Sequence, residues 1–279
     1  MRLLKTLQSD LNKLFLFELD DGFTVEAVFY RGDTLCVSTQ VGCPIRCEFC
    51  ASGKNGLIRN LTSEEIYNQY ALLKGSFPIK RIAVAGIGEP LANWKNVKDA
   101  FFRFKEEHLK VSFYTTGFPT KFLEELLLLP HSGVTISLHS LREDIRKKIM
   151  PHGGSLRELI ETLRTVLPKL SKKKRNKVSL AYLLMKGIND SEEELKELSS
   201  LARELGVNIT LLYYNQVSEN YKPVSPEEYE KAFLFLRSQG IRTTLSTRFR
   251  RDKLGGCGTL VVNRNKGKLK PFESPSFYA

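Results

Sequence analysis

Stretches typical of strands alternate with stretches typical of helices along most of this chain, and this alternation limits the possible folds most strongly. We expect strands over residues 80–85, 111–115, 134–138, 178–185, 208–213 and 242–247, which are rich in apolar residues. The helices expected between them begin near Thr62, Trp94, Thr120, Ser155, Ser191 and Ser225. Because strands separated by helices pair in parallel, the pattern predicts an α/β fold, a partial (β/α)6 barrel of the TIM type.

The residues before this alternation predict a small extension of the barrel. Residues 1–13 read as a short helix, and residues 14–20 and 23–30 read as two strands around an Asp-Asp-Gly turn, which predicts a β-hairpin. A strand over residues 34–39 then leads into a cysteine-rich loop. We therefore divide the chain into an amino-terminal helix and hairpin extension (1–33), a core barrel (34–250) and a carboxyl-terminal segment (251–279) that contains Cys257.

The amino-acid composition limits the kinds of binding partner and the cellular compartment that we expect. Lys and Arg number 43 against 31 Asp and Glu, so the net charge of +12 favours a polyanion partner such as nucleic acid, although a solvated lysine-rich surface also explains it. We see no signal peptide and no apolar run long enough to span a bilayer. Five cysteines, an odd number and mostly clustered, do not resemble a secreted disulfide framework, so we expect a cytoplasmic protein without a membrane partner.

Three cysteines are spaced in a way that is typical of metal ligands. Cys43, Cys47 and Cys50 form a CxxxCxxC pattern, with Phe49 just before the last cysteine. Thiolates select zinc, copper(I) or iron–sulfur clusters. A cubane normally takes four cysteines, so three local ligands leave one iron open for chemistry. A structural zinc site usually has a second short pair, which this sequence lacks, so the pattern favours iron–sulfur over zinc.

The spacing and its phenylalanine resemble the signature of the radical S-adenosylmethionine (SAM) superfamily. This resemblance implies a [4Fe-4S] cluster on Cys43, Cys47 and Cys50, with SAM bound at the open iron. It also implies an electron donor such as flavodoxin or ferredoxin, whose electron leads to cleavage of SAM into a 5′-deoxyadenosyl radical.

Further motifs narrow the resemblance. They are Cys36-Val-Ser-Thr-Gln-Val-Gly-Cys43, Arg59-Asn-Leu-Thr62, Gly88-Glu-Pro90, Ser137-Leu-His139, Met150-Pro151, Lys186-Gly-Ile-Asn-Asp190 and Gly256-Cys-Gly258. Together they look like the radical SAM adenosine methyltransferases of 23S ribosomal RNA and tRNA (the RlmN type, acting at adenine carbon 2, and the Cfr type, acting at carbon 8). The match runs in order from about residue 15 to residue 260, and it implies a monomeric enzyme whose partner is 23S rRNA or tRNA.

The resemblance assigns catalytic roles to the two remaining cysteines. Cys257 matches the cysteine that accepts a methyl group from SAM and carries it to the adenine ring. Cys36 matches the cysteine that releases the product, leaving a Cys36–Cys257 disulfide that must be reduced. Without the resemblance, Cys36 reads as a buried strand residue and Cys257 as an inert loop thiol.

The other site residues are also implied by the resemblance. Gly88 and Glu89 match the motif that holds the SAM amino group, Ser137 and Asn215 match positions near its ribose and carboxylate, and Leu138 and His139 complete the Ser-Leu-His element. Glu26 matches an acid proposed as the proton acceptor. The plainer interpretations are a turn glycine with a surface acid, a hydrogen-bonded strand-end histidine, and a solvent-facing Glu26.

Three departures from the family pattern affect the expected substrate. The family normally carries an accessory domain before the core, whereas we expect this sequence to begin almost at the core itself. Tyr114 stands where the family has a serine, and the usual acidic run before Cys257 is replaced by the basic residues 248–253. That basic stretch is either a phosphate-binding loop or a solvated loop.

We therefore expect methylation of an adenosine carbon, with carbon 2 favoured over carbon 8. The alternatives are a radical SAM enzyme with another substrate, such as a peptide, and an iron–sulfur or zinc RNA-binding module.

Overall fold

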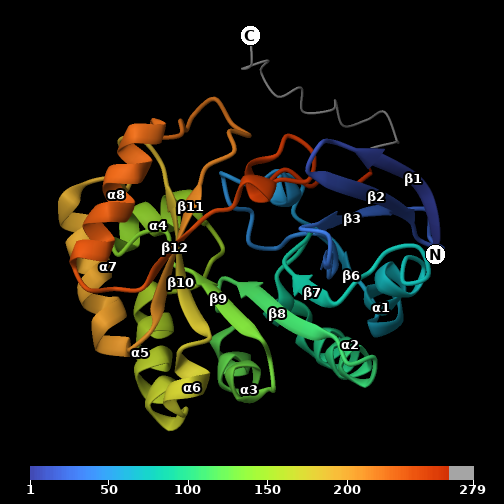
Figure 1. The fold of residues 1–279 in the computed structure, drawn as a ribbon, viewed down its shortest axis with the longest axis horizontal. Coiled ribbons are helices and arrows are strands. Elements are labelled where there is room, and N and C mark those ends of the chain that lie inside the picture. The colour runs from blue at the N-terminus through green and yellow to red at the C-terminus, as the bar shows by residue number, and fades with distance from the viewer. Residues whose placement is uncertain (264–279) are drawn as a thin grey trace.

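The computed structural model describes residues 1–263, and its centre is a ten-stranded sheet in the order β1-β2-β3-β4-β7-β8-β9-β10-β11-β12 (Figure 1). The strands are β1 (Arg2–Gln8), β2 (Asn12–Glu18), β3 (Thr24–Tyr30), β4 (Thr34–Val37), β7 (Arg81–Val84), β8 (Lys110–Thr115), β9 (Gly133–Ser137), β10 (Val178–Leu184), β11 (Asn208–Tyr213) and β12 (Thr243–Leu245). From β4 to β12 every neighbouring pair is parallel. The predicted partial α/β barrel is confirmed.

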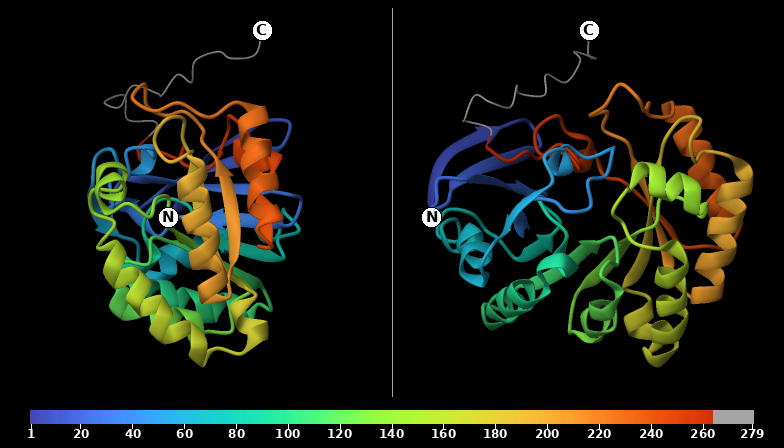
Figure 2. Two further views of the ribbon diagram at one scale, coloured as in Figure 1. Left: turned by 90° about the vertical axis from the view of Figure 1, so that its left-hand side faces the viewer. Right: turned by 180° about the vertical axis from the view of Figure 1, so that it is seen from behind.

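Most of the helices lie on the outer face of the curved sheet (Figure 2). The helices are α1 (Ser63–Ala71), α2 (Trp94–Glu106), α3 (Leu123–Leu128), α4 (Glu143–Ile149), α5 (Leu156–Val166), α6 (Lys172–Arg175), α7 (Glu192–Leu205) and α8 (Pro226–Ser238). Side-chain N-caps start several of them as predicted, at Thr62, Ser155, Ser191 and Ser225. Helix α4 was not predicted, because it is only seven residues long and has no side-chain cap.

The amino terminus differs from its prediction. Residues 1–13 are not a helix: they form β1 and the start of β2, which pair antiparallel. Main-chain and side-chain bonds between Ser9 and Asn12 reverse the chain between the two strands. The edge of β2 offers unpaired backbone groups that a strand satisfies at once, whereas a short isolated helix is only marginally stable in water. The hairpin predicted over residues 14–30 is confirmed as β2 and β3.

A small apolar cluster separate from the main core lies beneath the cysteine loop. It contains Ile45 from that loop, Ile149 and Met150 from the end of α4, and Met185 and Tyr214 from the ends of the parallel strands. The partly buried Cys43, Cys47 and Phe49 pack against it. The loop therefore rests on the carboxyl ends of the strands, where α/β barrels place their sites.

The segment 248–263 returns across the open top of the barrel, between the amino-terminal strands and the cysteine loop (Figure 1). The Asn12 side chain donates to the carbonyls of Phe249 (2.8 Å) and Leu254 (2.9 Å). The cysteine loop holds the segment too, through Ala51 N to Gly258 O (2.7 Å). Of the expected carboxyl-terminal segment 251–279, residues 264–279 lie outside the described part. In residues 1–263, no helix has the length and apolar character needed to cross a membrane.

We predict that Asn12→Ala loosens this segment. The substitution leaves two backbone carbonyls without their donor, which costs about 1–3 kcal/mol of unfolding free energy. Chemical denaturation measures the loss, and hydrogen exchange should rise in residues 248–263. Asn208→Ala is the control, because the Asn208 amide bonds only an exposed carbonyl at Asn176. Equal effects of both substitutions would contradict the anchoring role.

Candidate active site

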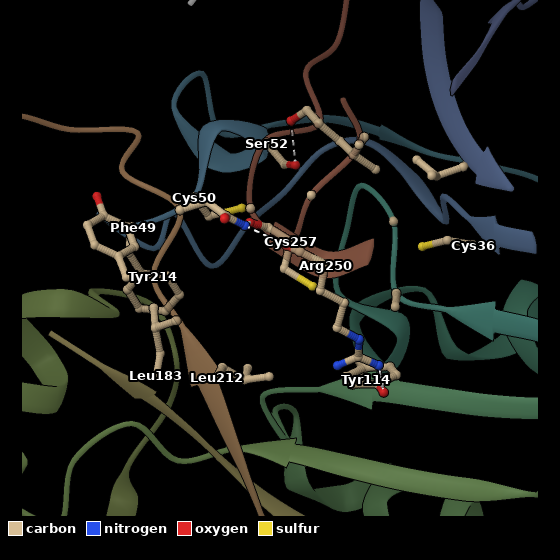
Figure 3. Close-up of a pocket in the computed structure, with 18 of the residues that line it drawn as sticks. Cys36, Phe49, Cys50, Ser52, Tyr114, Leu183, Leu212, Tyr214, Arg250 and Cys257 are labelled. Carbon is tan, nitrogen blue, oxygen red and sulfur yellow. Dashed lines mark hydrogen bonds between the residues drawn. The ribbon is translucent and has the colours of Figure 1, made fainter. Parts of the chain in front are cut away.

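A pocket opens at the carboxyl ends of the parallel strands (Figure 3). Its walls come from β4, β8, β9, the chain after β11, the cysteine loop and the segment 248–263. Six of the residues to which the sequence assigned a catalytic, cofactor-binding or cluster-binding role line it: Cys36, Cys50, Ser137, His139, Asn215 and Cys257. Residues separated by up to about two hundred positions therefore meet in one cavity, as the barrel topology predicts.

A two-stranded hairpin, β5 (Gln40–Gly42) and β6 (Leu57–Asn60), holds the base of the cysteine loop. Cys43 N donates to Gly56 O at 3.0 Å. A Cβ on Gly42 would lie 2.0 Å from that same carbonyl oxygen, and its φ of +84° also favours glycine. The loop can close only because this position has no side chain.

The donor chemistry of the loop fits an iron–sulfur cluster. Burial raises the pKa of Cys43 to about 12 and also raises the pKa values of Cys47 and Cys50, and neighbouring cysteine charges add to the shifts at Cys43 and Cys47. Such thiols become thiolates when a metal centre supplies the compensating charge. Within residues 1–263, no three Cys, His, Asp or Glu side chains group around a single metal ion. A cubane instead places its thiolates on separate irons.

Glu89 lies beside this loop and is buried. Its carboxylate accepts hydrogen bonds from Thr115 Oγ1, Thr116 N (2.7 Å) and Leu91 N (3.0 Å). Burial raises its pKa, and these bonds oppose the shift. Glu89 N donates to Gln40 Oε1 at 2.8 Å, which joins it to β5 at the base of the loop. The negative charge of Glu89 also contributes to the raised pKa of Cys43. The surface-acid interpretation is therefore wrong, and the carboxylate retains capacity for a further donor.

Gly88 precedes this glutamate at φ +115°, a conformation that L side chains rarely adopt. A Cβ there would lie 2.5 Å from Thr39 Oγ1. Glycine is therefore required for the turn that carries Glu89.

His139 is held rigidly at the end of β9. Leu183 N donates to its Nδ1 at 3.0 Å, so the ring proton resides on Nε2. Burial and, to a lesser extent, the charge of Arg146 together lower the pKa of His139 to about 3, so the ring is neutral. Phe49 packs edge-on against the ring, with centroids 5.0 Å apart. The neighbouring Leu138 points into the main core and does not line the pocket.

Asn189 explains the Lys-Gly-Ile-Asn-Asp motif in structural terms. Its side chain donates to His139 O (2.6 Å) and Leu183 O (2.7 Å) and accepts from Met185 N (2.8 Å). It fixes the main chain around His139, while the side chain itself does not line the pocket.

Cys36 and Cys257 project toward one another from opposite sides of the pocket (Figure 3). Burial and, to a lesser extent, the charge of Cys257 together raise the pKa of Cys36 to about 12. Asn215 holds the opposite wall, because its amide donates to Arg250 O (2.8 Å) and Cys257 O (2.9 Å). All five cysteines are free, so residues 1–263 contain no disulfide.

Glu26 is fully buried on β3, so its solvent-facing interpretation is wrong. Its Oε2 accepts a hydrogen bond from Val261 N at 2.9 Å, and its carbonyl accepts one from Ser38 Oγ. It binds the segment that carries Cys257 and lies outside the residues that line the pocket. An alternating strand pattern cannot show this, because the covering segment comes from the other end of the chain.

The basic stretch 248–253 has two faces, which the sequence did not reveal. Arg250 enters the pocket, donates to the Tyr114 hydroxyl and stacks 4.4 Å from the centre of its ring. Arg248, Arg251 and Lys253 remain exposed. Tyr114 and Arg250 both depart from the family pattern. Two such departures in one sequence were the only indication, before the structure, that these residues contact each other.

Comparisons with known proteins agree with this site. The family model described as the radical SAM superfamily matches residues 37–199. A probable dual-specificity RNA methyltransferase RlmN from Clostridium botulinum is 34% identical over 262 residues, covering 88% of this chain and 75% of the relative. One from Thermosipho melanesiensis is also 34% identical and covers 88% and 75%. The crystal structure of a radical SAM methyltransferase from Sphaerobacter thermophilus has a TM-score of 0.82 at 29% identity, covering 93% of this chain and 80% of that one.

The chain belongs to the radical SAM superfamily, and within it to the RlmN-type RNA methyltransferases. Enzymes of this superfamily use a [4Fe-4S] cluster and SAM. In this chain the thiols of Cys43, Cys47 and Cys50 are the residues that fit the cluster, for the chemical reasons given above.

We predict that anaerobically reconstituted protein binds about four irons. Cys43→Ala, Cys47→Ala and Cys50→Ala should each lose bound iron and SAM cleavage, because each removes one thiolate ligand. Cys36→Ala is the matched control, since Cys36 lies on the opposite wall and should leave the iron content unchanged. Full SAM cleavage in any of the three loop variants would refute the ligand set.

Proposed function

We propose that this enzyme methylates an adenosine carbon, with carbon 2 favoured over carbon 8, in 23S rRNA or tRNA. The observation that carries the proposal is the placement of Cys36 and Cys257 on facing sides of one pocket, beside Cys50 of the cysteine loop. Curated relatives are named dual-specificity RNA methyltransferases, which supports RNA as the substrate.

Cys257 is exposed on the segment 248–263, so its sulfur can reach a methyl donor. We propose that its thiolate attacks the methyl carbon of SAM, forming S-methylcysteine and releasing S-adenosylhomocysteine. When bound, the cluster and a second SAM supply the 5′-deoxyadenosyl radical, which takes one hydrogen atom from that methyl group. Asn215 holds the Cys257 carbonyl and thereby directs the methyl group into the pocket.

The carbon carried by Cys257 then bonds to the adenine ring, and the adduct has to be released. Cys36 faces Cys257 and is the thiol positioned to attack its sulfur. The attacked ring carbon loses its hydrogen as a proton, the carbon–sulfur bond breaks, and the ring-bound methylene takes up a proton to become the methyl group. A Cys36–Cys257 disulfide forms, and the one remaining electron returns to the external electron-transfer protein. An external reductant restores both thiols. We retain Glu26 as the proposed proton acceptor, because its carboxylate is bound to Val261 N in the segment that carries Cys257.

The charge distribution supports an RNA partner. The net charge is +12, and Arg248, Arg251 and Lys253 are exposed on the segment that forms one wall of the pocket. Cations at the rim of a site bind phosphates without reading sequence. A flavodoxin or ferredoxin in the cytoplasm is the proposed source of electrons for a monomeric enzyme.

The proposed function is tested by nucleoside mass spectrometry. RNA lacking the modification is incubated with the protein, SAM and a reductant and is then digested to nucleosides. We expect a methyladenosine with the new methyl group on a ring carbon, and Cys257→Ala should yield none. Production of 5′-deoxyadenosine without any methylated nucleoside, across 23S rRNA and tRNA substrates, would contradict an RNA methyltransferase.

We further predict that Cys36→Ala stalls with RNA covalently attached through Cys257. The variant keeps the methyl carrier and lacks the thiol that breaks the carbon–sulfur bond. A denaturing gel followed by nuclease digestion and peptide mass spectrometry detects the linked species. Cys36→Ala together with Cys257→Ala is the control and should show no linked RNA. Wild-type turnover by Cys36→Ala would refute the resolving role.

A further inference from the structure

Arg146 on α4 is a buried cation without a matching anion. Its side chain is only 1% exposed. Nη1 donates to Gly154 O (2.7 Å) and Nη2 donates to Gly153 O (3.0 Å), while the buried Nε has no hydrogen-bond partner. Both partners are neutral carbonyls, and within residues 1–263 Arg146 forms no salt bridge.

The nearest acid on the helix does not neutralise this charge. Glu143 contributes to the electrostatics of Arg146, but it is exposed and its carboxylate accepts from Leu156 N at 3.0 Å. A guanidinium stays protonated in proteins, so burial leaves a positive charge in a poorly solvated place. Buried charges of this kind are ordinarily paired, and leaving one unpaired is strongly destabilising. The structure therefore calls for an anion near Arg146.

The position of α4 shows where that anion lies. The end of α4 is bonded to the cysteine loop through Glu48 N to Ile149 O at 3.0 Å, and the next turn through His152 N to Ile45 O at 3.3 Å. Cys47 packs against the apolar cluster that contains Ile149. Arg146 lies one turn before Ile149, and its charge and that of Cys47 attract each other.

We propose that Arg146 is the buried counter-charge of the cluster held by Cys43, Cys47 and Cys50, and that it favours the reduced state. The proposal rests on the radical SAM assignment and deepens the proposed function. Three thiolates make the bound cluster an anion, and one electron from an external donor adds a further negative charge. A fixed neighbouring cation stabilises the added charge, because net charge and surroundings set the reduction potential of such clusters.

Two other roles for Arg146 make different predictions. As a purely structural brace it would only join α4 to Gly153 and Gly154 through their carbonyls. As a ligand of the SAM carboxylate it would change SAM affinity and leave the potential of the SAM-free protein unaltered. The measurements therefore separate the potential without SAM, SAM affinity and iron content.

The test uses the full chain with its reconstituted cluster, in the absence of SAM and RNA. The midpoint potential is measured by a redox titration followed by electron paramagnetic resonance for wild type, Arg146→Gln, Arg146→Lys and Lys147→Gln. Lys147 is the matched control, since it is the next residue on α4 and is exposed. Arg146→Gln should lower the equilibrium constant for reduction about tenfold, which is about 59 mV for one electron. Arg146→Lys should keep most of the potential, and Lys147→Gln should match wild type.

A wild-type potential in Arg146→Gln at full iron content would overturn the proposal, as would equal shifts in the Gln and Lys variants. A change in SAM affinity alone would also overturn it and would identify the SAM carboxylate as the anion. If Arg146→Gln does not fold, Arg146→Met replaces it, because an apolar side chain of similar length removes the unpaired charge. If Arg146→Gln and Arg146→Met both lose iron, the iron content of Arg146→Lys decides. Retention of iron in Arg146→Lys supports the proposal, and loss of iron in that variant overturns it. The redox titration contains no RNA. Its result therefore does not depend on whether the wild-type protein methylates RNA in a separate assay.

Discussion

The chemistry of this enzyme depends on one long-range contact, the attachment of the segment 248–263 to the cysteine loop. Ser52 Oγ donates to Leu260 O at 2.7 Å across 208 positions of sequence, and Ala51 N donates to Gly258 O at 2.7 Å. Asn215 adds two bonds to the same segment. Without these bonds, Cys257 would lie on an exposed segment that is not attached to the cysteine loop. With these bonds, Cys257 lines the same pocket as Cys36.

Buried charge is the second constraint on the site. Glu89 and Arg146 are both almost fully buried beside the cysteine loop, and they carry opposite charges. Glu89 is held by donors from the end of β8, whereas Arg146 is held by two neutral carbonyls. The protein therefore places one buried anion and one buried cation beside the loop. A second cation, Arg250, lies farther along the pocket against Tyr114.

The sequence predicted the repeating parts of the fold and the local motifs. Helix caps such as Ser191 and the apolar runs of the parallel strands are local signals, and the spacing of Cys43, Cys47 and Cys50 is also local. The errors concern residues whose conformation or burial depends on pairing or packing with another part of the chain. Residues 1–13 became strand because β2 offered an edge, and Glu26 is buried because the segment after Cys257 covers it. Arg146 lies on an uncapped helix whose burial no periodicity reveals.

The central claim is that Cys257 is the residue that receives the methyl group. The most direct measurement incubates the cluster-loaded protein with SAM carrying an isotopic label on its methyl group, followed by digestion and peptide mass spectrometry. The account predicts label on the Cys257 sulfur and on no other cysteine, and it predicts transfer of that label to RNA when RNA, reductant and an excess of unlabelled SAM are added. Formation of methylated RNA by a protein whose Cys257 never carries label would contradict the account.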